Sequence, residues 1–210
     1  MTRILIVDDH VVVRTGLRAL LETRHDFTVC AETGDGRDGV ALALKHKPDI
    51  VVLDVSLPTL NGIEATRQIR RGAPATEVLV FTMHDSEELI SEALHAGARG
   101  YLLKSADGEQ ILNAVRSLAR HCSFFSSQVS ETLLDQFNSG ALGHSSGLTP
   151  RERETVQLVA EGNSNKMIAR ALNLSVKTVE THRSAAMRKL SLGCTAELVR
   201  YAVRNKLTQV

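Results

Sequence analysis

Short apolar runs alternate with amphipathic stretches through the first 120 residues, and this alternation constrains the fold more than any other feature of the chain. Each run is four or five residues long, and the stretches between the runs space their apolar residues as a helix does. This pattern predicts five βα units in succession, which form a doubly wound five-stranded parallel sheet with helices on both faces. We expect strands at Ile4–Val7, Phe27–Ala31, Ile50–Leu53, Val78–Phe81 and Gly100–Leu103.

The pattern breaks after Arg120, where serine and glycine become frequent. Four apolar residues indicate one short amphipathic helix in this stretch, and the sequence NSGALGHSSG at 138–147 is typical of a flexible linker. We therefore expect an α/β domain over 1–120, a linker with one short helix over 121–147, and a second domain over 148–210. The apolar residues of the linker helix are Val129, Leu133, Leu134 and Phe137.

Residues 148–210 carry the signals of four short helices. The sequence TPRE at 149–152 combines an N-cap, a proline at the first helical position and a capping-box glutamate. A second helix ends before a tight turn at Asn173, and Ser175 caps a third helix whose apolar side, beginning with Val176, should face inward. Together with a last helix over about 195–205, this predicts a small all-α four-helix domain that contains a helix-turn-helix.

The formal net charge of +1 conceals an asymmetry between the two domains. Residues 148–210 hold 11 Lys and Arg against 5 Asp and Glu, a net +6, whereas residues 1–147 carry a net −5. A small basic domain joined to an acidic one predicts that only the C-terminal part binds a polyanion such as DNA.

The cellular compartment follows from what the sequence lacks. No apolar run approaches the ~20 residues that span a bilayer, and the N-terminus has no secretory pattern. Cys30, Cys122 and Cys194 form neither a ligand cluster nor a disulfide framework. We expect a cytoplasmic protein that does not bind membranes.

Polar side chains directly follow four of the five expected strands. Asp8 and Asp9 follow the first strand, Asp54 the third, Thr82 the fourth and Lys104 the fifth. The carboxyl ends of parallel strands flank the crevice in which open α/β sheets bind ligands. These five residues, far apart in the sequence, should therefore meet at one edge of the sheet.

The chemistry of this set points to a metal ion and a phosphoryl group. Two carboxylates ~4 Å apart at an effective dielectric near 20 repel each other by about 4 kcal/mol, so three of them require a cation. Mg²⁺ prefers such oxygen ligands and keeps waters and phosphate oxygens as further ligands. The Lys104 ammonium and the Thr82 hydroxyl suit phosphoryl oxygens, which predicts phosphoryl transfer to a carboxylate.

The segments IVDDH, VVLDVSLPTLNG, VFT and GYLLKS, in this order and spacing, resemble the receiver domain of two-component response regulators over residues 1–120. The resemblance implies that Asp54 is the phospho-acceptor and that a partner histidine kinase supplies the phosphoryl group. It also implies Mg²⁺ ligation by Asp8, Asp9, Asp54 and the backbone carbonyl of Ser56, phosphoryl binding by Thr82 and Lys104, and inward movement of Tyr101. His84, two residues after Thr82, is expected at the rim of the site, where it could tune hydrolysis of the phosphate.

Residues 148–210 resemble the DNA-binding domain of NarL/FixJ (LuxR-type) regulators. The third helix exposes a polar face of a kind that enters the major groove of DNA, formed by Lys177, Glu180, Thr181, Ser184 and Arg188. The resemblance implies base reading near Glu180, Thr181 and Ser184, phosphate contacts by Lys166, Thr178, Arg183 and Lys189, and dimer contacts by Leu198, Val199 and Ala202. Several family members have a basic residue where this chain has Glu180, which is a departure from the family pattern at a base-reading position.

A response regulator of this kind binds promoter DNA, forms homodimers when phosphorylated or DNA-bound, and has RNA polymerase as a further candidate partner. It is a stoichiometric phospho-acceptor rather than an enzyme. Two alternatives stay open: a constitutive regulator whose acidic pocket is unused, and an aspartyl-phosphate hydrolase. A hydrolase normally carries a second acid two residues after its nucleophile, where this chain has Ser56.

The segment GDGRDG at 34–39 matches the glycine pattern of dinucleotide-binding sites, with Asp54 at about the expected distance. Its two aspartates would place negative charges against a pyrophosphate, and it follows the strand expected at the sheet edge. We interpret it as the turn that enters a helix.

Overall fold

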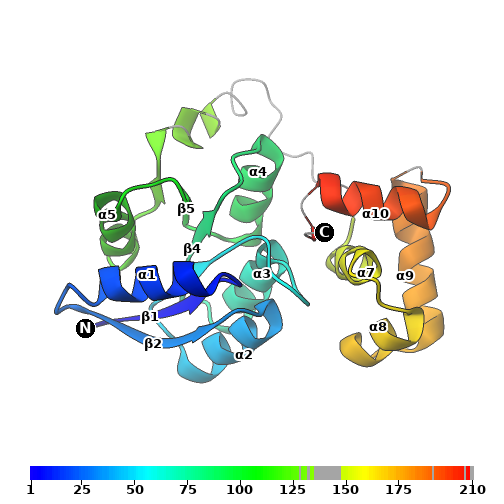
Figure 1. Ribbon diagram of the computed structural model, residues 1–210, viewed down its shortest axis with the longest axis horizontal. Coiled ribbons are helices and arrows are strands. Elements are labelled where there is room, and N and C mark those ends of the chain that lie inside the picture. Colours follow the sequence, from blue (N-terminus) through cyan, green and yellow to red (C-terminus); the bar gives the residue numbers. More distant parts are fainter. Residues whose placement is uncertain (128, 132, 135–147, 191, 206, 209–210) are drawn as a thin grey trace. The chain divides into compact units, whose positions relative to one another are not determined.

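The chain separates into two compact units, an N-terminal α/β unit and a C-terminal helical unit, and each is described by itself (Figure 1). No helix in the described parts of the chain is long and apolar enough to cross a membrane. The computed structural model describes residues 1–127, 129–131, 133–134, 148–190, 192–205 and 207–208.

The N-terminal unit is built on a parallel sheet with the strand order β2-β1-β3-β4-β5-β6. The five expected strands are present, and every residue of β3 is buried, as a strand covered on both faces requires. The prediction of five strands missed a sixth, β6, which is too short to leave a periodic signal. The strands are β1 (Thr2–Val7), β2 (Phe27–Thr33), β3 (Ile50–Leu53), β4 (Glu77–Thr82), β5 (Gly100–Leu103) and β6 (Phe124–Phe125).

Helices α1 to α5 cover the two faces of this sheet (Figure 1). Helix α1 packs beside α5 on one face, while α2, α3 and α4 pack in sequence on the other. The core beneath α1 and α5 includes Ile4, Ile6, Phe81 and Leu102, all buried. The helices are α1 (Val11–Leu21), α2 (Gly36–His46), α3 (Gly62–Gly72), α4 (Glu87–Ala96) and α5 (Gly108–Leu118).

The GDGRDG segment enters α2, as interpreted. The Asp35 carboxylate accepts hydrogen bonds from the backbone amides of Arg37 and Asp38 and so caps the helix. A side chain at Gly39 would collide with Val7 of β1, since an added Cβ would lie 2.8 Å from a Val7 methyl carbon. Both observations assign this segment to helix capping and helix–sheet packing.

The segment after α5 begins with β6 and continues with helical residues at 127, 129–131 and 133–134. Phe124 donates its backbone N–H to the Arg99 carbonyl at 3.1 Å, which starts the pairing of β6 with β5. Val129 is buried, in keeping with the short helix expected there. Phe137 and the expected flexible linker at 138–147 lie outside the described residues.

The described residues of the C-terminal unit form four helices around one core, as the sequence predicts. The capping box is formed: the Thr149 hydroxyl accepts the Glu152 N–H at 3.3 Å, and the Glu152 carboxylate accepts the Thr149 N–H at 2.7 Å. Asn173 takes a left-handed conformation with φ 54° and ends the second helix. The helices are α7 (Pro150–Ala160), α8 (Asn165–Leu172), α9 (Val176–Lys189) and α10 (Thr195–Arg204).

Two expectations about side chains in this unit are corrected. Val176 does not face inward, because it is 38% exposed in the first turn of α9. Leu198 and Ala202 are completely buried in the core of the unit, so their side chains cannot contact a second copy of the chain. Among the three residues expected at a dimer contact on α10, only Val199 is partly exposed.

Candidate acidic site and candidate DNA-binding face

Lys104 joins two of the carboxylates at the carboxyl edge of the sheet. Its Nζ lies 2.7 Å from Oδ2 of Asp54 and 2.7 Å from Oδ2 of Asp8, and all three side chains are buried. The other oxygen of Asp54, Oδ1, accepts the Val55 N–H at 2.6 Å. The ends of β1, β3 and β5 therefore bring these residues together, as the strand pattern predicts.

The local environment raises the pKa of the Asp8 carboxyl and of the Lys104 ammonium. Burial raises the pKa of the Asp8 carboxyl, although hydrogen bonds from Lys104 and from the His10 N–H act in the opposite direction. Burial alone would lower the pKa of the Lys104 ammonium, but its hydrogen bonds to Asp54 and Asp8 outweigh that effect and raise it. Lys104 is therefore a fixed cation at neutral pH.

The remaining donor set fits a divalent metal ion. Asp8, Asp9, Asp54 and His10 each offer one ligand atom, and these atoms all lie within 4.8 Å of one another. With Lys104 as the cation bonded to Asp8 and Asp54, three carboxylates still leave two negative charges to compensate. Oxygen-rich sites of this charge suit Mg²⁺. The structure thus confirms an aspartate cluster of the expected composition.

Thr82 ends β4 between the strands that carry Asp54 and Lys104. Its side chain is completely buried, and its hydroxyl has no hydrogen-bond partner within the described part of the chain. A buried polar group without a partner costs about 1–3 kcal/mol. The hydroxyl is therefore available to a ligand at this edge of the sheet.

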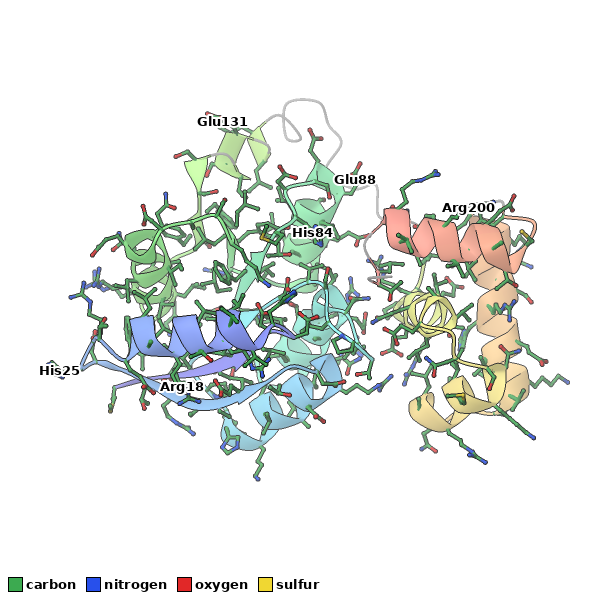
Figure 2. The ribbon with its side chains drawn as sticks, viewed as in Figure 1. Arg18, His25, His84, Glu88, Glu131 and Arg200 are labelled. Carbon is green, nitrogen blue, oxygen red and sulfur yellow. The ribbon has the colours of Figure 1, made fainter. Side chains whose placement is uncertain are left out.

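A hydrogen-bonded bridge crosses the rim of the site between the β3–α3 and β4–α4 loops. Oγ of Ser56 lies 2.8 Å from Nε2 of His84, and the phenol of Tyr101 donates to the His84 carbonyl at 2.8 Å. Tyr101 is completely buried, and burial, helped by the charges of Asp54 and Asp85, raises the pKa of its phenol. Figure 2 shows His84 beside α4.

Sequence reasoning placed Ser56 and His84 near the site but missed the bond between them. Ser56 lies two positions after Asp54, which follows β3, and His84 lies two positions after Thr82, which ends β4. This equal spacing is the sequence signal from which the contact between Ser56 and His84 could have been predicted. His10, whose Nδ1 lies 2.6 Å from Oδ1 of Asp9, is a further residue that the sequence analysis did not place at the site.

The polar face of α9 forms a shallow hollow of about 370 Å³. The Thr181 hydroxyl donates to the Lys177 carbonyl at 2.9 Å, a hydrogen bond within the helix. The side chains that line the hollow are those expected from the sequence, with one addition: Lys177, Glu180, Thr181, Ser184, Ala185 and Arg188.

Several residues expected to contact DNA phosphates are already engaged within the unit. Nζ of Lys189 lies 2.7 Å from the Glu152 carboxylate. The Arg183 guanidinium donates to the Thr195 hydroxyl and, at 3.4 Å, to Oδ1 of Asn165, so it connects α8, α9 and α10. Contacts from Lys189 and Arg183 to DNA stay predictions, and their observed contacts are internal.

Thr178 and Lys166, the other two expected phosphate contacts, lie at the starts of helices. The Thr178 hydroxyl lies 2.8 Å from the hydroxyl of Ser175, the N-cap of α9. Lys166 is exposed in the first turn of α8. Among the four residues expected to contact phosphates, Lys166 is the one for which no side-chain contact is described.

Family models match both units. Residues 4–116 match the response regulator receiver domain, and residues 146–202 match the luxR family of bacterial regulatory proteins. The oxygen regulatory protein NreC of Staphylococcus carnosus is 38% identical over 213 residues, covering 98% of each chain. NreC of Staphylococcus haemolyticus is 39% identical over 215 residues, again covering 98% of each chain.

Two solved structures agree with these matches, one along the whole chain and one over 66% of it. RcsB from Salmonella enterica serovar Typhimurium, bound to promoter rprA in the presence of the phosphomimetic BeF3-, is 28% identical with a TM-score of 0.66, covering 100% of this chain and 99% of that one. A LuxR-family two-component response regulator from Aurantimonas sp. SI85-9A1 is 37% identical with a TM-score of 0.63, covering 66% of this chain and 99% of that one. The chain belongs to the NarL/FixJ family of two-component response regulators, with a receiver domain followed by a LuxR-type helix-turn-helix DNA-binding domain.

Proposed function

We propose that Asp54 accepts a phosphoryl group from a partner histidine kinase and that this modification controls sequence-specific binding of the C-terminal unit to promoter DNA. The observation that carries the proposal is the Asp54–Lys104 contact of 2.7 Å at the strand end next to the buried, unpartnered hydroxyl of Thr82. An acceptor carboxylate, a fixed cation and an available hydroxyl donor occupy three adjacent strand ends, β3, β5 and β4.

In the transfer step, a carboxylate oxygen of Asp54 attacks the phosphorus of a phosphohistidine. The new P–O bond forms as the P–N bond breaks, and the departing imidazole keeps the bond's electron pair and takes up a proton. Lys104 and Thr82 then donate hydrogen bonds to phosphoryl oxygens, and such pre-positioned donors stabilise the charge that develops during transfer.

Asp8, Asp9 and Asp54 would hold Mg²⁺ together with the backbone carbonyl of Ser56. When bound, Mg²⁺ supplies positive charge that offsets the phosphoryl oxygens and the carboxylates. The chain's own part is to hold Asp8 and Asp54 in place through Lys104.

Phosphorylation of Asp54 would be transmitted through the hydrogen bonds that join Ser56, His84 and Tyr101 at the rim of the site. If Thr82 turns to bind the phosphoryl group, the β4–α4 loop that follows it moves with His84, whose carbonyl accepts from Tyr101. Tyr101 lies on β5 in register with Phe125 of β6, and β6 begins the segment that leads to the C-terminal unit. A local charge change is thereby coupled to the linker.

On the DNA side, α9 enters the major groove with Lys177, Glu180, Thr181, Ser184 and Arg188. Phosphorylated or DNA-bound protein forms homodimers that prefer half-sites about one helical turn apart. The RcsB structure solved on promoter rprA with a phosphomimetic supports binding of promoter DNA by the phosphorylated form. The protein acts in the cytoplasm, with RNA polymerase as a further candidate partner.

The protein is a stoichiometric acceptor rather than a phosphatase. Ser56, which stands where a hydrolase normally carries its second acid, is bonded to His84 and offers no carboxyl group. A turnover assay on phosphate esters separates the two functions, because an acceptor takes up one phosphoryl group per chain.

The test of the main proposal has two stages. Treatment with acetyl phosphate and Mg²⁺ should add the mass of one phosphoryl group to wild type and none to Asp54→Asn. DNA selected from genomic fragments should then bind phosphorylated wild type more tightly than unphosphorylated protein or Asp54→Asn. Equal affinity in all three forms would show a constitutive regulator with an unused pocket.

A further inference from the structure

The His10 imidazole faces the acidic site. Its Nδ1 lies 2.6 Å from Oδ1 of Asp9 and 3.3 Å from Oδ1 of Asp8. One nitrogen of the His10 ring lies within 4.8 Å of a carboxylate oxygen of each of the three aspartates, Asp54 included. A basic ring nitrogen thus belongs to the same compact set of donors as the carboxylates.

The cap of helix α1 does not hold the His10 side chain. His10 is the N-cap residue of α1, yet its side chain makes no capping hydrogen bond. The Asp8 carboxylate instead accepts the His10 backbone N–H at 2.9 Å. Because the imidazole does no work in capping the helix and is about half exposed, binding an ion would replace its contacts to Asp9 and Asp8 and would not break a helix cap.

We propose that the His10 imidazole is a further protein ligand when Co²⁺ or Zn²⁺, rather than Mg²⁺, is held by Asp8, Asp9 and Asp54. Neither the family match nor the carboxylate chemistry assigns this role, and the inference builds on the metal site of the proposed function. A mixed set of three carboxylates and one imidazole differs in kind from an all-oxygen set.

The consequence is a change in which metals the site prefers. Mg²⁺ takes oxygen ligands and keeps its waters, so a nearby imidazole adds little to its binding. Imidazole suits Zn²⁺, Ni²⁺ and Cu²⁺, and affinities at mixed nitrogen–oxygen sites rise from Mn²⁺ through Co²⁺ to Cu²⁺. The site should therefore bind Co²⁺ and Zn²⁺ through His10 and bind Mg²⁺ without it.

Two variants of His10 distinguish the loss of a metal ligand from a loss of folding. His10→Ala removes the ligand, and His10→Asn keeps a good helix N-cap but offers an amide oxygen in place of nitrogen. His25 is the matched control, because it is exposed in the turn after α1, at the opposite end of the sheet from His84 (Figure 2). Circular dichroism checks that each variant is folded.

Titration calorimetry on the full-length reduced protein would use MgCl₂, CoCl₂ and ZnCl₂. Both His10 variants should lose at least about tenfold in affinity for Co²⁺ and Zn²⁺, with Mg²⁺ affinity within about twofold of wild type, and His25→Ala should match wild type for all three. The Co²⁺ absorption bands should change in the His10 variants alone. Equal losses for all metals, or no loss for Co²⁺ and Zn²⁺, would overturn the proposal.

These readouts do not depend on phosphorylation. If the metal preference follows His10 but Asp54 takes no phosphoryl group from acetyl phosphate, the proposed function fails and the ligand assignment stands. If Asp54 is phosphorylated and the His10 variants bind every metal as wild type does, only the ligand assignment fails.

Discussion

In the N-terminal unit the candidate site draws its side chains from the ends of β1, β3, β4 and β5, whereas in the C-terminal unit the base-reading candidates all lie on α9. The first site depends on topology, because parallel strands must end at a common edge. The second depends on which face of one helix the core leaves uncovered. The two sites also differ in how their basic side chains are paired. Lys104 forms ion pairs with two carboxylates, whereas no ion pair within the described residues involves Lys177 or Arg188.

This difference teaches where each site is vulnerable. A substitution at the acidic edge alters an interconnected set of charges, so its effects should be large and shared among neighbours. A substitution on the outer face of α9 alters one contact with an outside partner, so its effects should be smaller and separable. The predictions below probe this contrast in decreasing order of expected effect.

Replacing Lys104 should have the largest effect. Lys104→Ala leaves Asp8 and Asp54 without their shared cation, and loss of one charge-stabilising donor typically slows a reaction about 10²–10³-fold. Phosphorylation by acetyl phosphate, followed by mass spectrometry, measures the rate. Lys177→Ala, which removes an exposed lysine from α9, should leave this rate unchanged, and an equal slowing in both variants would erase the contrast.

Replacing Glu180 should change base preference without abolishing binding. A carboxylate on a recognition helix accepts from cytosine N4, and one base-specific contact is worth about 1–3 kcal/mol. Sequence selection from a random DNA pool with Glu180→Ala should lose preference at one position per half-site. By contrast, Lys177→Ala should weaken binding to all sequences and reduce the salt dependence by about one phosphate contact.

Replacing Lys189 tests whether its observed ion pair is structural. Lys189→Met removes the partner of the Glu152 carboxylate, which is itself part of the capping box. With Lys189 partly exposed, the free energy of unfolding should fall by about 1 kcal/mol, as read from urea denaturation. If stability is unchanged and only DNA affinity falls, Lys189 is a phosphate contact instead.

The ion pair between Glu152 and Lys189 predicts that the free energy of unfolding depends on pH. Burial acts to raise the pKa of the Glu152 carboxyl, but hydrogen bonds from Lys189 and Thr149 outweigh it and hold the pKa below its usual value. A carboxyl with a lowered folded pKa stabilises the fold above its unfolded pKa, about 4.3, and loses that contribution as the pH falls through the folded value. Denaturation at a series of pH values should show this loss in wild type and not in Glu152→Gln.

Replacing Ser56 should have the smallest effect. Ser56→Ala removes the bond to His84 across the rim, which should admit water more easily and shorten the lifetime of the aspartyl phosphate. One hydrogen bond of about 0.5–1.5 kcal/mol corresponds to roughly a two- to tenfold change. Decay of the phosphorylated mass after removal of the phosphodonor measures it, and a longer lifetime would contradict this role.

The acidic site could be predicted from sequence because each of its residues follows a strand that the apolar pattern already locates. Contacts that depend on long side chains could not. Nothing in the spacing of Lys189 shows that it reaches Glu152, 37 residues away, or that Arg183 connects three helices. Leu198 and Ala202 were expected at a dimer contact, yet helical periodicity cannot separate a residue that faces its own core from one that faces a partner.

Strand β6 bears on how the receiver should be cut from the rest of the chain. Its two residues pair with Gly100 and Tyr101 at the outer edge of β5, where unpaired backbone groups would otherwise be open to pairing with another molecule. The family match ends at residue 116, before this strand begins. A fragment that stops there would carry a bare edge and should aggregate more readily than one that continues past Phe125, so the smallest well-behaved receiver is longer than its sequence signature.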